Sequence, residues 1–263
     1  MSRTQILADR ISEPITADAL RTHARERDEI LADLTKSLEA EVRVKAAWLW
    51  GSFMRGEQDD LSDLDLWLLV DDDCVETFDQ TVAAWCAKAG EMVSGAINRH
   101  NSPPDGLYFG ALLAGTHGLH HLDIYWQPTG QYPPQGANLL ANRQPQKQRH
   151  PIPLPPNPPT NLAFVWLMIS VAAKYLARDP ASDMQLLTYP RNAFEESVKE
   201  LGLQEAIGQV EWECPEEPQG KVEVLRELVR KTKRLDEGYG APPSANRALT
   251  NYIDLVGVIV ASR

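Results

Sequence analysis

The residues best suited to chemistry lie in one short segment, residues 48–70, where two aspartates stand two positions apart. Asp63 and Asp65 come at the start of an apolar run, residues 64–70, that is typical of a buried strand. Side chains on a strand alternate between its faces, so both carboxylates point to one side, about 6–7 Å apart. Two carboxylates aimed at one spot suit Mg²⁺, which prefers oxygen ligands and completes its shell with water and phosphate.

A glycine and a serine upstream of the acids indicate a phosphate-binding turn. Gly51 and Ser52 follow an apolar strand and open a short helix. Glycine lets the backbone approach a ligand closely, and the N–H groups at a helix start, with the Ser52 hydroxyl, can bind phosphate oxygens. Arg55 lies one turn further on and could pair with phosphate or with Asp63 or Asp65.

A third acid would complete such a site, and Asp123 is the candidate. It lies in a second strand-like run, residues 119–126. If that strand neighbours residues 64–70, Asp123 joins the pair. It would serve there as a third ligand for metal ions about 3.5–4 Å apart, or as the general base for an acceptor hydroxyl. The alternative interpretation is a surface acid without a catalytic role.

The elements that must position these residues are helices and strands in the N-terminal half of the chain, followed by helices alone. Helices are expected at residues 17–40, 75–89, 162–176, 222–235 and 246–260, and strands at residues 42–50, 64–70, 107–113 and 119–126. Ten of the 19 prolines lie between positions 128 and 159. Because proline removes backbone donors, we expect a linker there rather than regular structure.

The order Gly51-Ser52, Arg55-Gly56 and Ser62-Asp63-Leu64-Asp65-Leu66 resembles the signature of the DNA polymerase beta-like nucleotidyltransferase superfamily. Within it, chain length and a helical C-terminal half are similar to those of bacterial aminoglycoside and lincosamide nucleotidyltransferases. The resemblance implies Asp63 and Asp65 as metal ligands, Gly51 and Ser52 at the triphosphate, and Asp123 as third acid. Met54 departs from the pattern, because a small residue usually precedes the arginine.

The expected fold is therefore α+β, with a mixed β-sheet flanked by helices and a C-terminal α-helical domain. The expected boundaries are a nucleotidyltransferase catalytic domain at residues 1–127, a Pro-rich linker at 128–160 and a helical substrate-binding domain at 161–263. The expected reaction moves a nucleoside monophosphate, AMP from ATP in the first instance, onto a hydroxyl of a small molecule with Mg²⁺. An aminoglycoside-type antibiotic is one candidate acceptor.

The overall composition bears on the class of binding partner and on the cellular compartment. A net charge of −11 counts against a nucleic acid partner, whose phosphates need Lys and Arg, and is compatible with a cationic acceptor. Three cysteines without a CxxC pair favour a reducing cytoplasm. The first residues lack the apolar region of a signal peptide, and no apolar run is long enough to span a membrane. Oligomeric state is not predicted.

Several alternatives stay open. Asp63 and Asp65 could be turn residues before a strand, and Arg55 a structural ion-pair partner. A zinc site is disfavoured, because the adjacent His120 and His121 would face opposite ways on a strand. Two roles remain possible for Glu195 and Glu196, which lie on a predicted helix. They could reach the cleft, or they could belong to an exposed helix face. The alternative functions are a protein-modifying or antitoxin-type nucleotidyltransferase and a non-catalytic nucleotide-binding module.

Overall fold

The computed structural model describes residues 14–98, 101–129, 138–142, 162–181, 185–204, 215–236 and 243–262. By their contacts these residues form two compact units. The first takes His23–Leu113 and the described part of His120–Pro158, and it holds the sheet. The second takes Ala114–Leu119 and the described parts of Ala8–Thr22 and Pro159–Arg263. The α+β class is confirmed, whereas the domain boundaries at 127 and 160 stay predictions.

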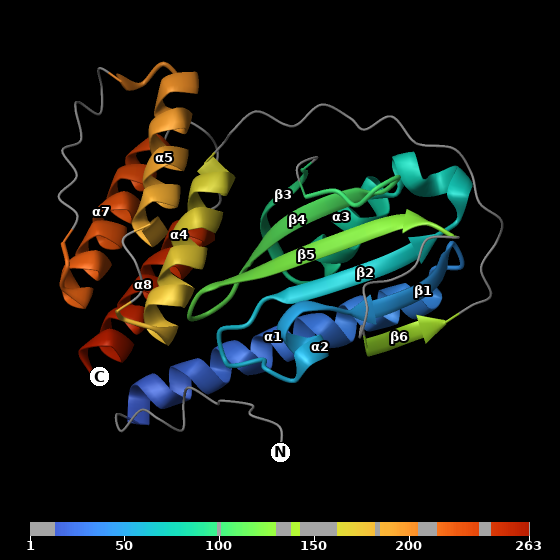
Figure 1. The fold of residues 1–263 in the computed structure, drawn as a ribbon, viewed down its shortest axis with the longest axis horizontal. Helices are drawn as coiled ribbons and strands as arrows, with labels where there is room; N and C mark the ends of the chain where they lie inside the picture. Colours follow the sequence, from blue (N-terminus) through green and yellow to red (C-terminus); the bar gives the residue numbers. More distant parts are fainter. Residues whose placement is uncertain are drawn as a thin grey trace. The chain divides into compact units, whose positions relative to one another are not determined.

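The sheet of the first unit has six strands in the order β3-β4-β5-β2-β1-β6 (Figure 1). Their bounds are β1 Val44–Leu49, β2 Leu64–Val70, β3 Glu91–Ile97, β4 Leu107–Ala114, β5 Leu119–Pro128 and β6 Asn138–Asn142. β1 is antiparallel to both β2 and β6, while β2 and β5 run parallel. The sheet is therefore mixed, as expected.

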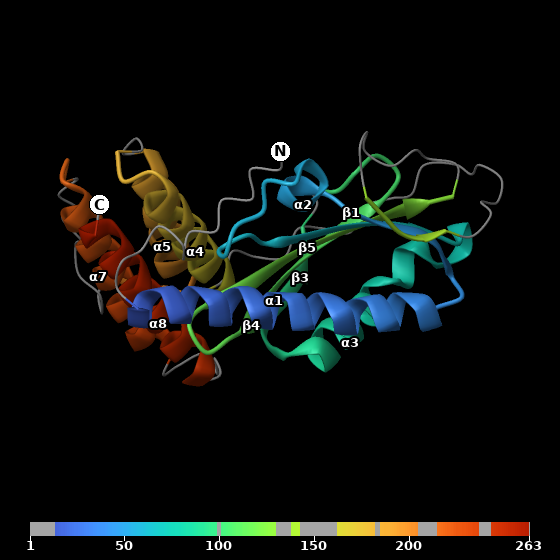
Figure 2. The same ribbon diagram turned by 90° about the horizontal axis from the view of Figure 1, so that it is seen from below.

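One face of the sheet is apolar and covered by helices. Helix α1, Pro14–Ala40, and helix α3, Asp79–Ala89, lie on the same side of the sheet in Figure 2. The short helix α2, Gly51–Arg55, lies on the opposite side. Alternate residues of β2 supply the buried face: Leu64, Leu66 and Leu68 are at most 1% exposed. They pack in one cluster with α1 and α3. The polar residues of β2 consequently lie on the opposite face.

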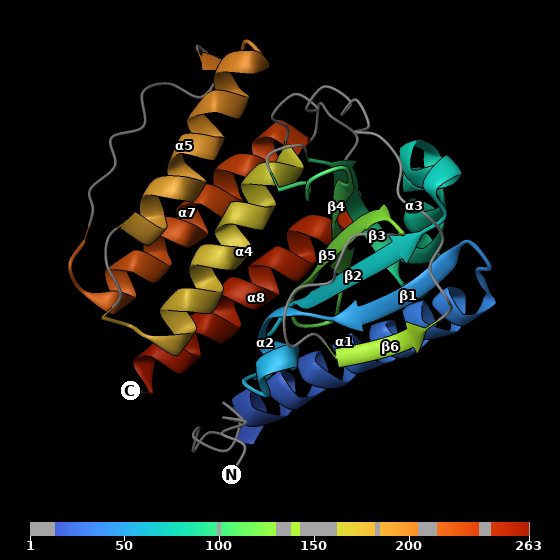
Figure 3. The same cartoon turned by 45° about the vertical axis from the view of Figure 1, so that its right-hand side comes forward.

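The second unit is helical. Its helices are α4 Leu162–Arg178, α5 Gln185–Glu200, α7 Pro218–Asp236 and α8 Pro243–Ala261, and α4 packs against the other three (Figure 3). The apolar face of α4 that the sequence indicated is buried, including Val165, Ile169 and Leu176. Among the described residues, no helix combines the length and apolar character that crossing a membrane requires.

The expected strands before and after the acids are present, and two further strands were not expected. β3 carries a mostly half-buried sequence without a clear apolar alternation. β6 lies within the range that the prolines marked as a linker, and it pairs with the edge of β1. The rest of residues 130–161 lies outside the described residues. The helix expected at 75–89 is divided into a 3₁₀ helix, Asp72–Thr77, and α3.

Because one face of the sheet is buried, truncating a buried and an exposed apolar side chain should lower the free energy of unfolding by very different amounts. Leu66→Ala removes a side chain that is 1% exposed in the core and should lower the free energy of unfolding by about 2–5 kcal/mol. The control Val42→Ala truncates a side chain that is 70% exposed and should change it by less than about 0.5 kcal/mol. Urea unfolding measures both, and equal effects would contradict the assignment of the buried face.

Candidate active site

The parallel pairing of β2 with β5 brings the three predicted acids together. In the register of these strands Asp65 is the partner of Asp123, and Leu64 is the partner of Leu122. Neighbouring strands lie about 4.8 Å apart, so the two carboxylates lie side by side on the face opposite the core. Asp63 lies two residues before Asp65 and shares its face. The condition set for Asp123, a strand next to residues 64–70, is met.

His121 lies between two of these acids. Its Nδ1 is 3.7 Å from Asp63 Oδ2, and its Nε2 is 3.0 Å from Asp123 Oδ1. Burial disfavours the charged imidazole, but the carboxylates of Asp123 and Asp63 outweigh burial and raise the pKa of His121 to about 10. The imidazole thus carries a positive charge at neutral pH and neutralises part of the acid cluster. His120 faces the other way, toward α1, as the strand alternation predicted.

Tyr108, on β4, holds the third acid. Its phenol donates a hydrogen bond to Asp123 Oδ1. Burial and the charge of Asp123 raise the pKa of Tyr108, so the phenol keeps its proton and stays a donor. Sequence reasoning missed both Tyr108 and His121. The position of His121, two residues before Asp123, was a usable signal, whereas the approach of Tyr108 depends on the order of β4 and β5.

The predicted phosphate turn touches the acids directly. Gly51 has φ of +63°, a conformation that side chains with a Cβ rarely adopt. A Cβ added there would lie 2.0 Å from Asp65 Oδ2, so the carboxylate fills the space beside the glycine. The Trp50 N–H donates to the carbonyl oxygen of Asp65 at 2.9 Å. The turn and the acid are therefore fixed to each other by both backbone and side chain.

Two other predicted residues of the turn differ in their surroundings. The Ser52 hydroxyl is buried and makes no hydrogen bond to the described residues. Its hydrogen-bonding capacity is therefore not used by these residues. Arg55 is exposed and pairs with Glu57 at 2.6 Å. The role of Arg55 at a phosphate stays a prediction.

A row of aromatic rings borders the acids on the same face of the sheet. Trp67 stacks on Tyr125 with ring centroids 5.0 Å apart, and Tyr125 meets Tyr108 at 4.9 Å. Trp50 extends the row beyond Trp67 at 5.9 Å. Burial and the carboxylates of Asp123, Asp65 and Asp63 raise the pKa of Tyr125, as expected for a concentrated negative field. The Nε1–H of Trp67 is buried without a hydrogen-bond partner among the described residues.

The two acids considered in the helical half are exposed. Glu195 and Glu196 lie on the solvent side of α5, and Glu195 pairs with Arg191 of the same helix at 2.9 Å. They belong to the second unit, whereas the acid cluster belongs to the first. Within the described residues their surroundings correspond to an exposed helix face.

Comparisons with known proteins bear on the segment that carries the motif. Residues 32–92 match the family model of polymerase beta-type nucleotidyltransferases, and this range includes Gly51, Ser52, Asp63 and Asp65 but not Asp123. No curated protein matches the chain.

A solved structure, described as a STING-associated CdnE c-di-GMP synthase from Capnocytophaga granulosa, aligns with 97% of this chain and 84% of that chain. The sequence identity is 10% and the TM-score 0.27, which is too low to establish a common fold or activity. The family match covers residues 32–92 only, so it shows that the segment whose acids and turn meet in the structure is similar to nucleotidyltransferases of the polymerase beta type.

Proposed function

We propose that the chain transfers a nucleoside monophosphate, with ATP as the first candidate donor, to a hydroxyl of a small molecule and releases pyrophosphate. The observation that carries this proposal is the meeting of three carboxylates, Asp63, Asp65 and Asp123, with the Gly51-Ser52 turn on one face of the sheet. A triphosphate needs both a cation-binding acid cluster and a turn that accepts its oxygens closely.

The donor set fits Mg²⁺. Asp63, Asp65 and Asp123 offer hard oxygen ligands from two neighbouring strands, and the buried strand behind them holds their spacing. His121 is not a ligand that Mg²⁺ prefers, but its positive charge already lies between Asp63 and Asp123. We place the cation beside these two carboxylates. Bound there, the metal would neutralise the phosphate charge and orient the reacting oxygens.

The residues of the chain then divide into distinct roles. Asp63 and Asp65 would hold the cation, and the Ser52 hydroxyl would donate a hydrogen bond to a phosphate oxygen. The acceptor oxygen attacks the α-phosphorus, the bond between the α-phosphorus and the bridging oxygen breaks, and pyrophosphate leaves with the electron pair. Asp123 takes the hydroxyl proton or acts as a third ligand. Tyr108 is a positioning residue, because its hydrogen bond orients the Asp123 carboxylate.

The charge of the chain favours a cationic acceptor. With a net charge of −11 and three acids on one face, a polycation such as an aminoglycoside would be concentrated near the site. The same charge disfavours a nucleic acid acceptor. The cysteines within the described residues, Cys74 and Cys86, are buried free thiols, which suits a reducing cytoplasm.

The proposal predicts pyrophosphate release that requires Mg²⁺, a nucleoside triphosphate and one acceptor. The assay offers ATP or GTP with a panel of aminoglycosides and lincosamides, and each nucleotide alone. In Asp63→Asn or Asp65→Asn the rate should fall by about 100-fold or more, because the carboxylate charge that holds the cation is lost.

The matched control is Glu57→Gln, which removes an exposed carboxylate beside Arg55 and should keep the wild-type rate. Activity that survives in Asp63→Asn and Asp65→Asn would contradict the site. Release from nucleotides alone would keep the reaction class and reject the antibiotic acceptor, since a second nucleotide would then supply the hydroxyl.

A second prediction concerns the close contact between the turn and Asp65. Gly51→Ala should abolish pyrophosphate release, because the new methyl group would lie 2.0 Å from the Asp65 carboxylate and must displace it. The control is Gly202→Ala, where φ is also positive, at +68°, but nothing lies within 4 Å of the added Cβ.

Both variants place a residue with a Cβ at a positive φ, which destabilises each by about 1–2 kcal/mol. They therefore separate strain from displacement of the carboxylate. Thermal unfolding and kcat/KM for pyrophosphate release are measured for each. If kcat/KM falls by the same factor in both variants, the contact between Gly51 and Asp65 is not a determinant of the site.

A further inference from the structure

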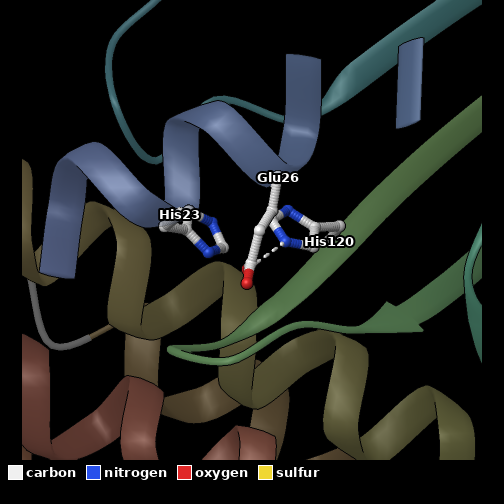
Figure 4. A group of neighbouring side chains, drawn as sticks. All are labelled: His23, Glu26 and His120. Carbon is white, nitrogen blue, oxygen red and sulfur yellow. Dashed lines mark hydrogen bonds and ion pairs between the residues drawn. The ribbon is translucent and has the colours of Figure 1, made fainter. Parts of the chain in front are cut away.

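Two histidines and a glutamate gather on the core-facing side of the sheet, away from the acids of the active site. His23 and Glu26 lie one turn apart on α1, and His120 lies near the start of β5 (Figure 4). The two histidines are 3% and 4% exposed, and Glu26 is partly buried. Because His120 and His121 point to opposite faces, this cluster is separate from the one around Asp63 and Asp123.

The ligand atoms of the cluster lie close together, and one pair has the spacing found in a transition-metal site. His120 Nε2 lies 3.2 Å from Glu26 Oε2. One nitrogen from each histidine and one carboxylate oxygen all lie within 4.8 Å of one another. In a tetrahedral zinc site with bonds of about 2.0–2.1 Å, neighbouring ligand atoms are about 3.3 Å apart. One pair already has this spacing, and a His23 nitrogen lies within 4.8 Å of both atoms of that pair.

The donor set selects the kind of ion. Two imidazoles and one carboxylate suit Zn²⁺, whereas Mg²⁺ and Ca²⁺ prefer oxygen ligands. As metal ligands the two imidazoles would be neutral, so the set would bring one negative charge to the divalent cation. We propose that His23, Glu26 and His120 form a binding site for one Zn²⁺ ion, with water at the fourth position.

The site would join two segments that are far apart in the sequence. Glu26 and His120 are 94 residues apart, and a shared ion would fasten α1 to the start of β5. Since β5 carries Asp123 three residues later, the ion would stabilise the strand that supplies the third acid. This proposal does not depend on the reaction proposed above, because it concerns other residues on the other face of the sheet.

Metal titration of the full chain tests the proposal. The protein is stripped with a chelator, and Zn²⁺ affinity is measured by competition with a chromogenic chelator, with Co²⁺ absorption as a second readout. The wild type should bind one equivalent and melt at a higher temperature with Zn²⁺. Glu26→Gln and His23→Asn/His120→Asn should weaken binding by about tenfold or more, because even outer-shell changes have effects of this size.

Three further variants separate ligation from other effects. His117→Asn removes a histidine outside the cluster, and Asp63→Asn/Asp123→Asn disables the acid cluster, so both should keep the bound equivalent. Glu26→His supplies a ligand without the carboxylate and should bind Zn²⁺, whereas Glu26→Gln should not. This comparison tests ligation by residue 26 even if the double histidine variant fails to fold. Wild-type affinity in Glu26→Gln, or no Zn²⁺ uptake by the wild type, would overturn the proposal.

Discussion

The parallel pairing of β2 with β5 is the constraint on which the site depends. Its register sets Asp65 opposite Asp123, and a shift by one residue would send one of them into the core. The leucines of β2 make such a shift unfavourable, since Leu64, Leu66 and Leu68 are buried under the helices. The apolar face of the strand thus holds the polar face in place.

The same strand also positions the turn, through β1 on its other side. The antiparallel pairing of β1 and β2 returns the chain beside Asp65, where Gly51 leaves room for the carboxylate. The result is a concentration of negative charge next to a tight turn. His121 lies between Asp63 and Asp123, 3.7 Å and 3.0 Å from their carboxylate oxygens. Tyr108 completes the arrangement by orienting Asp123 from the neighbouring strand.

The positions of the site residues within one short segment of the chain were predictable from the sequence. The contacts between elements that are distant in the sequence were not. Asp63 and Asp65 stand two residues apart at the start of β2, so their common face follows from strand periodicity. The alternation also predicted that His120 and His121 face opposite ways. Tyr108 and the partners of His120 escaped prediction, because they require the strand order and the packing of α1 on the sheet. β6 escaped because the surrounding prolines indicated a linker.

The most direct test of the central claim is a crystal structure with Mn²⁺ and a non-hydrolysable ATP analogue, in which anomalous scattering locates the ions. The account predicts an ion bonded to carboxylate oxygens of Asp63 and Asp65, with Asp123 bonded or adjacent and the triphosphate against Gly51 and Ser52. An ion or a triphosphate bound elsewhere, with His121 still between Asp63 and Asp123, would contradict it.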